Sequence, residues 1–145
     1  MVRQPKSTSK PNVRKQSHPN CVVCSSENAS GLQLTFDTLE DGSVQASFDC
    51  DEKYVGYDGM LHGGVISSLL DGAMTNYLFA QGRTGFTGEL IVRFRQPVAI
   101  GRTASIRAWS TRFFPPFHAL AAELTQDGEV KARARAKFME PTPSR

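Results

Sequence analysis

The clearest hydrophobic pattern in the chain lies between residues 63 and 81, where apolar residues recur at four-residue spacing. Two such rows run side by side: Val65, Leu69, Ala73 and Tyr77, then Ile66, Leu70, Met74 and Leu78. Adjacent rows at this spacing form the broad apolar face of an α-helix. Gly82 follows as a C-terminal cap. The pattern predicts one long helix that buries most of its surface.

Strands are predicted wherever apolar and polar residues alternate in steps of two. Before the helix, residues 31–36 (GLQLTF) and 43–50 (SVQASFDC) flank an Asp-Gly turn, which is typical of a β-hairpin. After the helix, four more strands are predicted, at residues 89–95, 103–111, 118–126 and 131–138. The order is therefore a hairpin, one helix and four strands, with no internal repeat and no βαβ alternation.

The last predicted strand indicates how the helix and the sheet pack together. Its inner row carries Ala132, Ala134 and Ala136, which leave room for a neighbouring backbone, while its outer row is basic and either solvated or able to attract phosphates. A sheet with one apolar face and a single apolar helix bury both surfaces when the sheet curls around the helix. We predict an α+β fold in which a curved antiparallel sheet of about five to six strands wraps one long helix.

Residues 1–19 differ in composition from the rest of the chain. They hold five basic residues and three prolines but no acidic residue, and without those five charges the net charge falls from +3 to −2. Such a segment buries too little apolar surface to offset the entropy of ordering it. We predict a disordered basic arm at 1–19 and one folded domain at 20–145. The arm is more typical of a solvating segment than of a nucleic-acid ligand or a mitochondrial presequence.

Composition narrows the class of protein further. Apolar residues make up 39% of the 145 residues and charged residues 21%, which suits a single globular domain. No run reaches the roughly 18 apolar residues of a membrane span, and the start lacks the apolar region of a signal peptide. We therefore expect a cytoplasmic protein without membrane or nucleic-acid partners.

Three cysteines stand at positions 21, 24 and 50. His18, Cys21 and Cys24 have an H-x2-C-x2-C spacing that could begin a zinc site, but no second pair of ligands follows to complete a tetrahedron. An odd number of cysteines also disfavours a disulfide framework. From the sequence we expect reduced thiols, no bound metal and no organic cofactor.

The predicted helix contains a carboxylate, Asp71, although its surroundings are apolar. It lies on a polar side with serine, threonine and asparagine neighbours, where it could face solvent or a hydrogen-bond partner. An unpaired carboxylate facing protein is costly, and such a group can serve as a general base or a nucleophile. Asp71 is therefore a candidate catalytic residue.

The helix begins with His62, Gly63 and Gly64. Backbone N–H groups at a helix start lack intrahelical acceptors, and the glycines let a ligand approach them, so they form a site for a developing oxyanion. Asp71 lies nine residues after His62, roughly 13 Å along the axis, too far for both to reach one carbonyl carbon. Two antiparallel copies of the helix would bring them together, so we predict a homodimer with sites across its interface.

These segments resemble the hotdog-fold acyl-CoA thioesterases of the PaaI-like type. The resemblance rests on GYDGMLHGGVISSLLDGAM at 56–74, CVVCSSENASGLQLTFD at 21–37 and TGELIVRFRQPVAIG at 87–101, and it covers residues 20–140. It implies a helix wrapped by an antiparallel sheet, dimers that often pair into tetramers, and hydrolysis of an acyl-CoA thioester.

The resemblance also implies roles for single residues. Gly63 would donate its N–H to the thioester oxygen, and Asp71 of the partner subunit would activate water or attack directly. His62 would shape the oxyanion site, and Thr87 matches a Ser or Thr that holds the attacking water in some relatives. Predicted substrate contacts complete the set: Gly56, Met60, Gly64 and Met74.

One position departs from the family pattern. Several relatives carry an asparagine six residues before the histidine, where this chain has Gly56. That difference favours a second hypothesis, a hotdog protein that binds acyl-CoA without cleaving it, whereas the retained Asp71 and glycine pair favour the thioesterase. A hydratase fits poorly, since it needs a catalytic histidine paired with an acid in another arrangement. The preferred acyl group is left open, although Phe113, Phe114 and Phe117 are candidates for its pocket.

Overall fold

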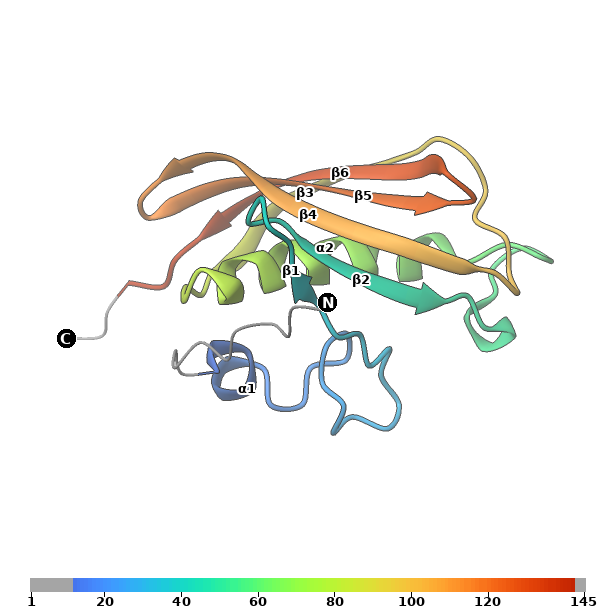
Figure 1. Cartoon of the computed structure of the whole chain (residues 1–145), viewed down its shortest axis with the longest axis horizontal. Helices are drawn as coiled ribbons and strands as arrows, with labels where there is room; N and C mark the ends of the chain where they lie inside the picture. The colour runs from blue at the N-terminus through green and yellow to red at the C-terminus, as the bar shows by residue number, and fades with distance from the viewer. Residues whose placement is uncertain (1–11, 143–145) are drawn as a thin grey trace, which may run out of the picture.

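The computed structural model describes residues 12–142 as one long helix packed against a six-stranded antiparallel sheet (Figure 1). The elements in chain order are α1 (Val13–Ser17), β1 (Asp37–Thr38), β2 (Val44–Asp49), η1 (Glu52–Tyr54), α2 (Gly63–Ala80), β3 (Phe86–Phe94), β4 (Thr103–Phe114), β5 (Phe117–Gln126) and β6 (Glu129–Met139). The strands lie in the order β1-β2-β4-β5-β6-β3. Consecutive strands β4, β5 and β6 form a meander, and β3 returns to the far edge beside β6.

The core lies between α2 and the concave face of the sheet. Leu69, Leu70 and Met74 of α2 are fully buried there, against strand residues such as Ile106 and Leu124. The sheet curves over the length of α2 (Figure 1). The predicted α+β architecture is confirmed.

The alanine row of β6 is part of this core. Ala132, Ala134 and Ala136 are all buried, while Arg133 and Arg135 between them are exposed. Small side chains at these positions let α2 pack close to the backbone of β6, as the alanine row predicts.

Both ends of α2 are capped. The His62 side chain caps the start, and a turn at the predicted residue Gly82 caps the end. The His62 ring accepts a hydrogen bond from the Gly64 N–H at the start. At the end, Gly82 has a φ of +73° and Arg83 donates its N–H to the Leu78 carbonyl, which is a Schellman motif. In residues 12–142, no helix combines the length and apolarity needed to cross a bilayer.

The N-terminal segment differs from the predicted disordered arm. Residues 13–17 form α1, capped by Asn12, and the chain then packs along the side of α2 that faces away from the sheet (Figure 1). Its Val23 is buried, and a Cβ at Gly72 would meet the Val23 Cγ1 at 2.5 Å. Order begins before residue 20 because this segment covers an α2 face that the sheet leaves open; residues 1–11 lie outside the described part.

The prediction of a first hairpin strand at residues 31–36 is also wrong, because the observed strand β1 is only Asp37–Thr38. Residues 31–36 do not join the sheet, because Leu32 and Leu34 donate their N–H groups to the Val22 and Val23 carbonyls. Gln33 between them has a φ of +54°. Only Asp37 and Thr38 pair with β2, so the alternation reflects packing against the N-terminal segment.

Candidate functional site

A cleft of about 730 Å³ opens at the start of α2, a size typical of small-molecule sites. One wall comes from residues 55–63, including Gly56, Met60, His62 and Gly63, and the other from residues 94–98 that follow β3. Two of the four predicted substrate contacts, Gly56 and Met60, therefore lie on the cleft wall together with two of the predicted catalytic residues.

The N–H groups at the start of α2 are not equivalent. The His62 Nδ1 accepts from Gly64, at 2.8 Å, so the Gly64 N–H is occupied and Gly64 is absent from the cleft wall. Gly63 is the first residue of the helix, and among residues 12–142 its N–H has no hydrogen-bond acceptor. The Gly63 N–H is therefore the donor available to a ligand, and the helix dipole adds positive potential there.

Gly56 lies directly against the helix start. A Cβ at this position would be 3.0 Å from the His62 Cα, while the Gly56 N–H donates to the Met60 carbonyl. The missing side chain lets the 56–60 turn pack against the residue that caps α2. An asparagine could be accommodated only if this turn moved by a few tenths of an ångström.

Asp71 and Thr87 form a second group, about two turns further along α2. The Thr87 hydroxyl, on β3, donates to the Asp71 Oδ1 at 2.7 Å. Asp71 is half-buried and Thr87 exposed, so the carboxylate is fixed by one hydrogen bond and keeps its second oxygen available. This pairing connects two predicted catalytic residues that are 16 positions apart.

Within one chain the two groups do not meet. Gly63 lines the cleft, whereas Asp71 and Thr87 do not, and eight residues of helix separate Gly63 from Asp71 by roughly 12 Å. Phe94, at the other end of β3 from Thr87, is the side chain nearest to Gly63, since a Cβ at Gly63 would lie 3.6 Å from its ring. Strand β3 therefore runs antiparallel to α2. The Asp71 carboxylate lies near the Thr87 end of β3, and the free Gly63 N–H lies near its Phe94 end.

Other predicted contacts lie elsewhere. Met74 is fully buried in the core, because it lies on the face of α2 that turns toward the sheet, so it has no access to the cleft. Phe113, Phe114 and Phe117 are 45%, 58% and 50% exposed at the β4–β5 hairpin, away from the cleft wall. Phe94 and Gln96, which do line the cleft, were not predicted because their alternation pattern marks only a strand end.

The charge of Asp71 also reaches the N-terminal segment. Burial lowers the pKa of His18, the Arg14 charge lowers it further, and the Asp71 carboxylate partly opposes both. The His18 ring meets the Phe79 ring of α2 edge-on, at 4.9 Å between centroids. Residues around His18 therefore border the polar side of α2.

Comparison with known proteins identifies the family. The model of the Thioesterase superfamily matches residues 58–132, just over half of the chain and including the whole of α2. SSO1253 of Saccharolobus solfataricus, which is named as a candidate esterase, is 32% identical over 72 residues. That match spans 48% of each protein, so the chain aligns with about half the length of this relative.

Solved structures share the fold over more of the chain. The thioesterase superfamily protein RHA08564 is 26% identical with a TM-score of 0.77, over 81% of this chain and 62% of that one. PaaI of Escherichia coli, from the phenylacetic acid degradation operon, is 19% identical with a TM-score of 0.71, over 77% and 81%. The smu.793 protein of Streptococcus mutans, bound to acetyl-CoA, is 19% identical with a TM-score of 0.69, over 74% and 88%.

The family match covers the helix start, Asp71 and β3, and the structural likeness extends to the whole sheet and helix. This chain belongs to the thioesterase superfamily and has the hotdog fold of its PaaI-like members.

Proposed function

We propose that the protein is an acyl-CoA thioesterase whose active sites form between two copies of the chain. The observation that carries this proposal is the arrangement of two half-sites on α2 and β3: a free Gly63 N–H at one end, and an Asp71 carboxylate held by Thr87 at the other. Acetyl-CoA bound to a protein of the same fold supports a CoA thioester as the substrate class.

The sheet topology supports a homodimer that would join these half-sites. Strand β3 is at the edge of the described sheet, where its backbone can pair with another strand. Two β3 edges related by a twofold axis would run antiparallel. A half-turn about the middle of β3 exchanges its ends, so the Thr87 end of one chain would meet the Phe94 end of the other.

Such a pairing gives each composite site a complete set of groups. The cleft beside Gly63 would hold the thioester, with its carbonyl oxygen accepting from the Gly63 N–H, which stabilises the negative charge that develops there. Asp71 of the opposite subunit would take a proton from water as the water oxygen bonds to the carbonyl carbon. The C–S bond then breaks, and CoA leaves as its thiol with the proton returned.

A second candidate function is supported by Gly56. The family asparagine at this position helps to place the nucleophilic water, and here the 56–60 turn packs against His62 with no side chain. A chain that lacks this amide could bind acyl-CoA without cleaving it. We favour hydrolysis because Thr87 provides another polar group beside Asp71.

The experiment that tests hydrolysis is release of CoA thiol, followed with a thiol reagent, over short, medium, long and aryl acyl-CoAs. We expect saturable release by the wild type and a loss of roughly 10²–10⁴-fold in kcat for Asp71→Asn, because the variant cannot accept a proton. Glu129→Gln is the matched control, since it removes an exposed carboxylate that lies at the β5–β6 turn and forms an ion pair with Lys131.

The outcomes separate the two functions. Release that is lost in Asp71→Asn and kept in Glu129→Gln supports the thioesterase. Saturable binding of acyl-CoA with no release would establish the binding protein. Full activity in Asp71→Asn would exclude the proposed base.

A further inference from the structure

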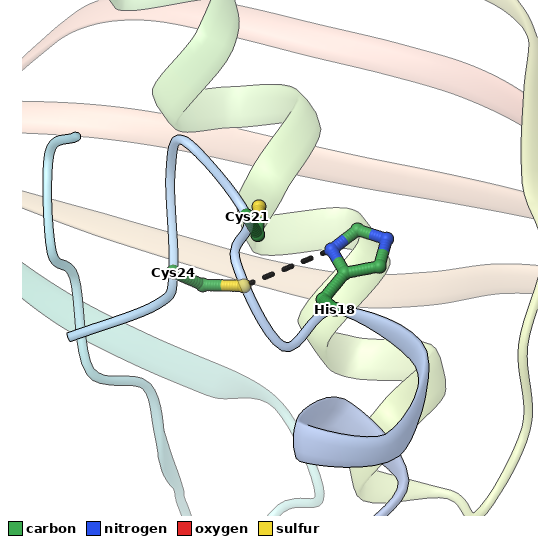
Figure 2. A group of neighbouring side chains, drawn as sticks. All are labelled: His18, Cys21 and Cys24. Carbon is green, nitrogen blue, oxygen red and sulfur yellow. Dashed lines mark hydrogen bonds between the residues drawn. The ribbon is translucent and has the colours of Figure 1, made fainter. Parts of the chain in front are cut away.

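The turn that follows α1 brings three metal-binding side chains together. His18, Cys21 and Cys24 each direct one ligand atom toward the others, and these atoms all lie within 4.8 Å of one another. Figure 2 shows the three side chains on this turn, over the α2 ribbon, with the Cys24 Sγ directed at the His18 ring. The Cys24 Sγ is 3.8 Å from the His18 Nδ1.

The distance between the Cys24 Sγ and the His18 Nδ1 matches the geometry of a bound zinc ion. Zn–S bonds of about 2.3 Å and Zn–N bonds of about 2.0–2.1 Å, at tetrahedral angles, separate a sulfur from a nitrogen by about 3.6 Å. The Cys24 Sγ and the His18 Nδ1 already lie close to this separation, and the Cys21 Sγ, within 4.8 Å of its two partners, would move closer to them on binding. Two thiolates with an imidazole are a ligand set that suits Zn²⁺ better than Mg²⁺ or Ca²⁺.

Hydrogen bonds fix the backbone around the cluster. The Val23 N–H donates to the Cys21 Sγ at 3.3 Å, and bonds of this kind orient and stabilise a ligating thiolate. The Arg14 guanidinium donates to the carbonyls of His18 and Cys24, at 3.3 and 3.2 Å. The turn is thus held in its ligating shape from both ends.

We propose that His18, Cys21 and Cys24 bind one Zn²⁺ ion, which fixes the turn that packs on α2 through the contact between His18 and Phe79. Binding would displace the two thiol protons, and the zinc would close the loop from residue 18 to residue 24 against the helix. Water or a group from a second chain would take the fourth position, because residues 1–11 and 143–145 contain no His, Cys, Asp or Glu and the described residues add no further ligand to the cluster.

A zinc site here departs from the expectation of reduced structural thiols, which rested on the missing second pair of ligands. Cys50 shows what a structural thiol looks like in this protein: it is buried beside the core, and burial, with help from the Asp49 charge, raises its pKa to about 11. Cys21 and His18 are both half-buried, while Cys24 is buried. The site is therefore open enough for an ion to enter.

The first test measures zinc per chain in the full-length protein, after reduction, loading with Zn²⁺ and removal of excess metal. We expect one zinc per chain in the wild type and in Cys50→Ala, and loss of zinc in Cys24→Ser and in His18→Ala. Retention of one zinc by both Cys24→Ser and His18→Ala, or no zinc in the reduced wild type, would overturn the proposal.

A second measurement needs no variant, so it stays decisive if a substitution unfolds the chain. Alkylation of the wild type, mapped by mass spectrometry, should modify Cys21 and Cys24 after treatment with a chelator and leave both unmodified after Zn²⁺ is restored. Cys50 should not change between the two states. Equal alkylation of Cys21 and Cys24 with and without Zn²⁺ would contradict the site.

Discussion

Gly63 can be tested without disturbing the helix that it begins. Proline is favoured at the first position of a helix, and His62 before it already has the extended backbone that proline requires, with φ −61° and ψ 134°. Gly63→Pro therefore removes the N–H and adds a ring beside Phe94 while remaining compatible with the helix. We expect kcat to fall by about 10²–10³-fold, as for loss of one oxyanion donor.

Gly63→Ala is the matched control, because it keeps the N–H and its Cβ would make ordinary contact with the Phe94 ring at 3.6 Å. Thermal unfolding should show both variants folded. If Gly63→Ala lost as much activity as Gly63→Pro, the space at Gly63 and not its N–H would be the property that matters.

Thr87 acts through its hydrogen bond to Asp71 in the proposed mechanism. Thr87→Val keeps the shape and removes the hydroxyl, which costs one bond to a charged group, about 1.5–3 kcal/mol. The expected result is a loss of about 10–100-fold in kcat with little change in KM, measured by thiol release. Thr87→Ser should recover most of the rate; a serine variant as slow as valine would show that the hydroxyl is not the group in use.

Single residues of the candidate site could be predicted only where the sequence around them carries a local pattern. His62, Gly63 and Asp71 stand out because a glycine pair at a helix start exposes free N–H groups and because a carboxylate interrupts an apolar helix. The bond between Thr87 and Asp71 could not be derived from spacing, since it joins a strand to a helix 16 residues away. Met74 was misplaced because helical periodicity alone does not say which apolar ridge faces the sheet.

At the level of elements, the contact between α2 and the N-terminal segment depends on Gly72. A Cβ there would lie 2.5 Å from the Val23 Cγ1, so Gly72→Ala should destabilise the fold by about 1–3 kcal/mol in urea unfolding. Ser68→Ala, on the same helix, is the control and should change stability little.

A double variant separates this contact from a general effect on the helix. In Gly72→Ala with Val23→Ala, the clashing methyl is gone, so the combined cost should be smaller than the sum of the two single costs. Strict additivity would indicate that Val23 does not press on α2 in solution.

The elements themselves were predicted well where periodicity is strong. The helix α2 follows the four-residue spacing of apolar residues, and the strands β2 to β6 follow the alternation of apolar and polar residues. The predicted capping residue Gly82 comes directly after the observed C-cap, Gln81. The N-terminal segment was not predicted, because its order comes from Val23, His18 and Phe79 packing between distant parts of the chain. Amino-acid composition does not predict the structure of a segment that is ordered by tertiary contacts and side-chain clusters.

At the scale of the whole molecule, the proposed mechanism requires that no single chain contain a working site. Gly63 and Asp71 lie on one helix with two turns between them, and β3 offers an edge about which a second chain would bring them together. The cytoplasmic location and the pairing of dimers into tetramers remain predictions from the sequence. The proposed mechanism requires the dimer but not the tetramer.

The most direct test of the shared active site is complementation between two inactive variants. Asp71→Asn and Gly63→Pro chains would be mixed, allowed to exchange subunits, and assayed by thiol release, with exchange verified by mass spectrometry of differently tagged chains. Random mixing should give about a quarter of the wild-type activity, because half of the dimers are mixed and each mixed dimer regains one of its two sites. No recovery in verified mixed dimers would contradict an active site shared between subunits.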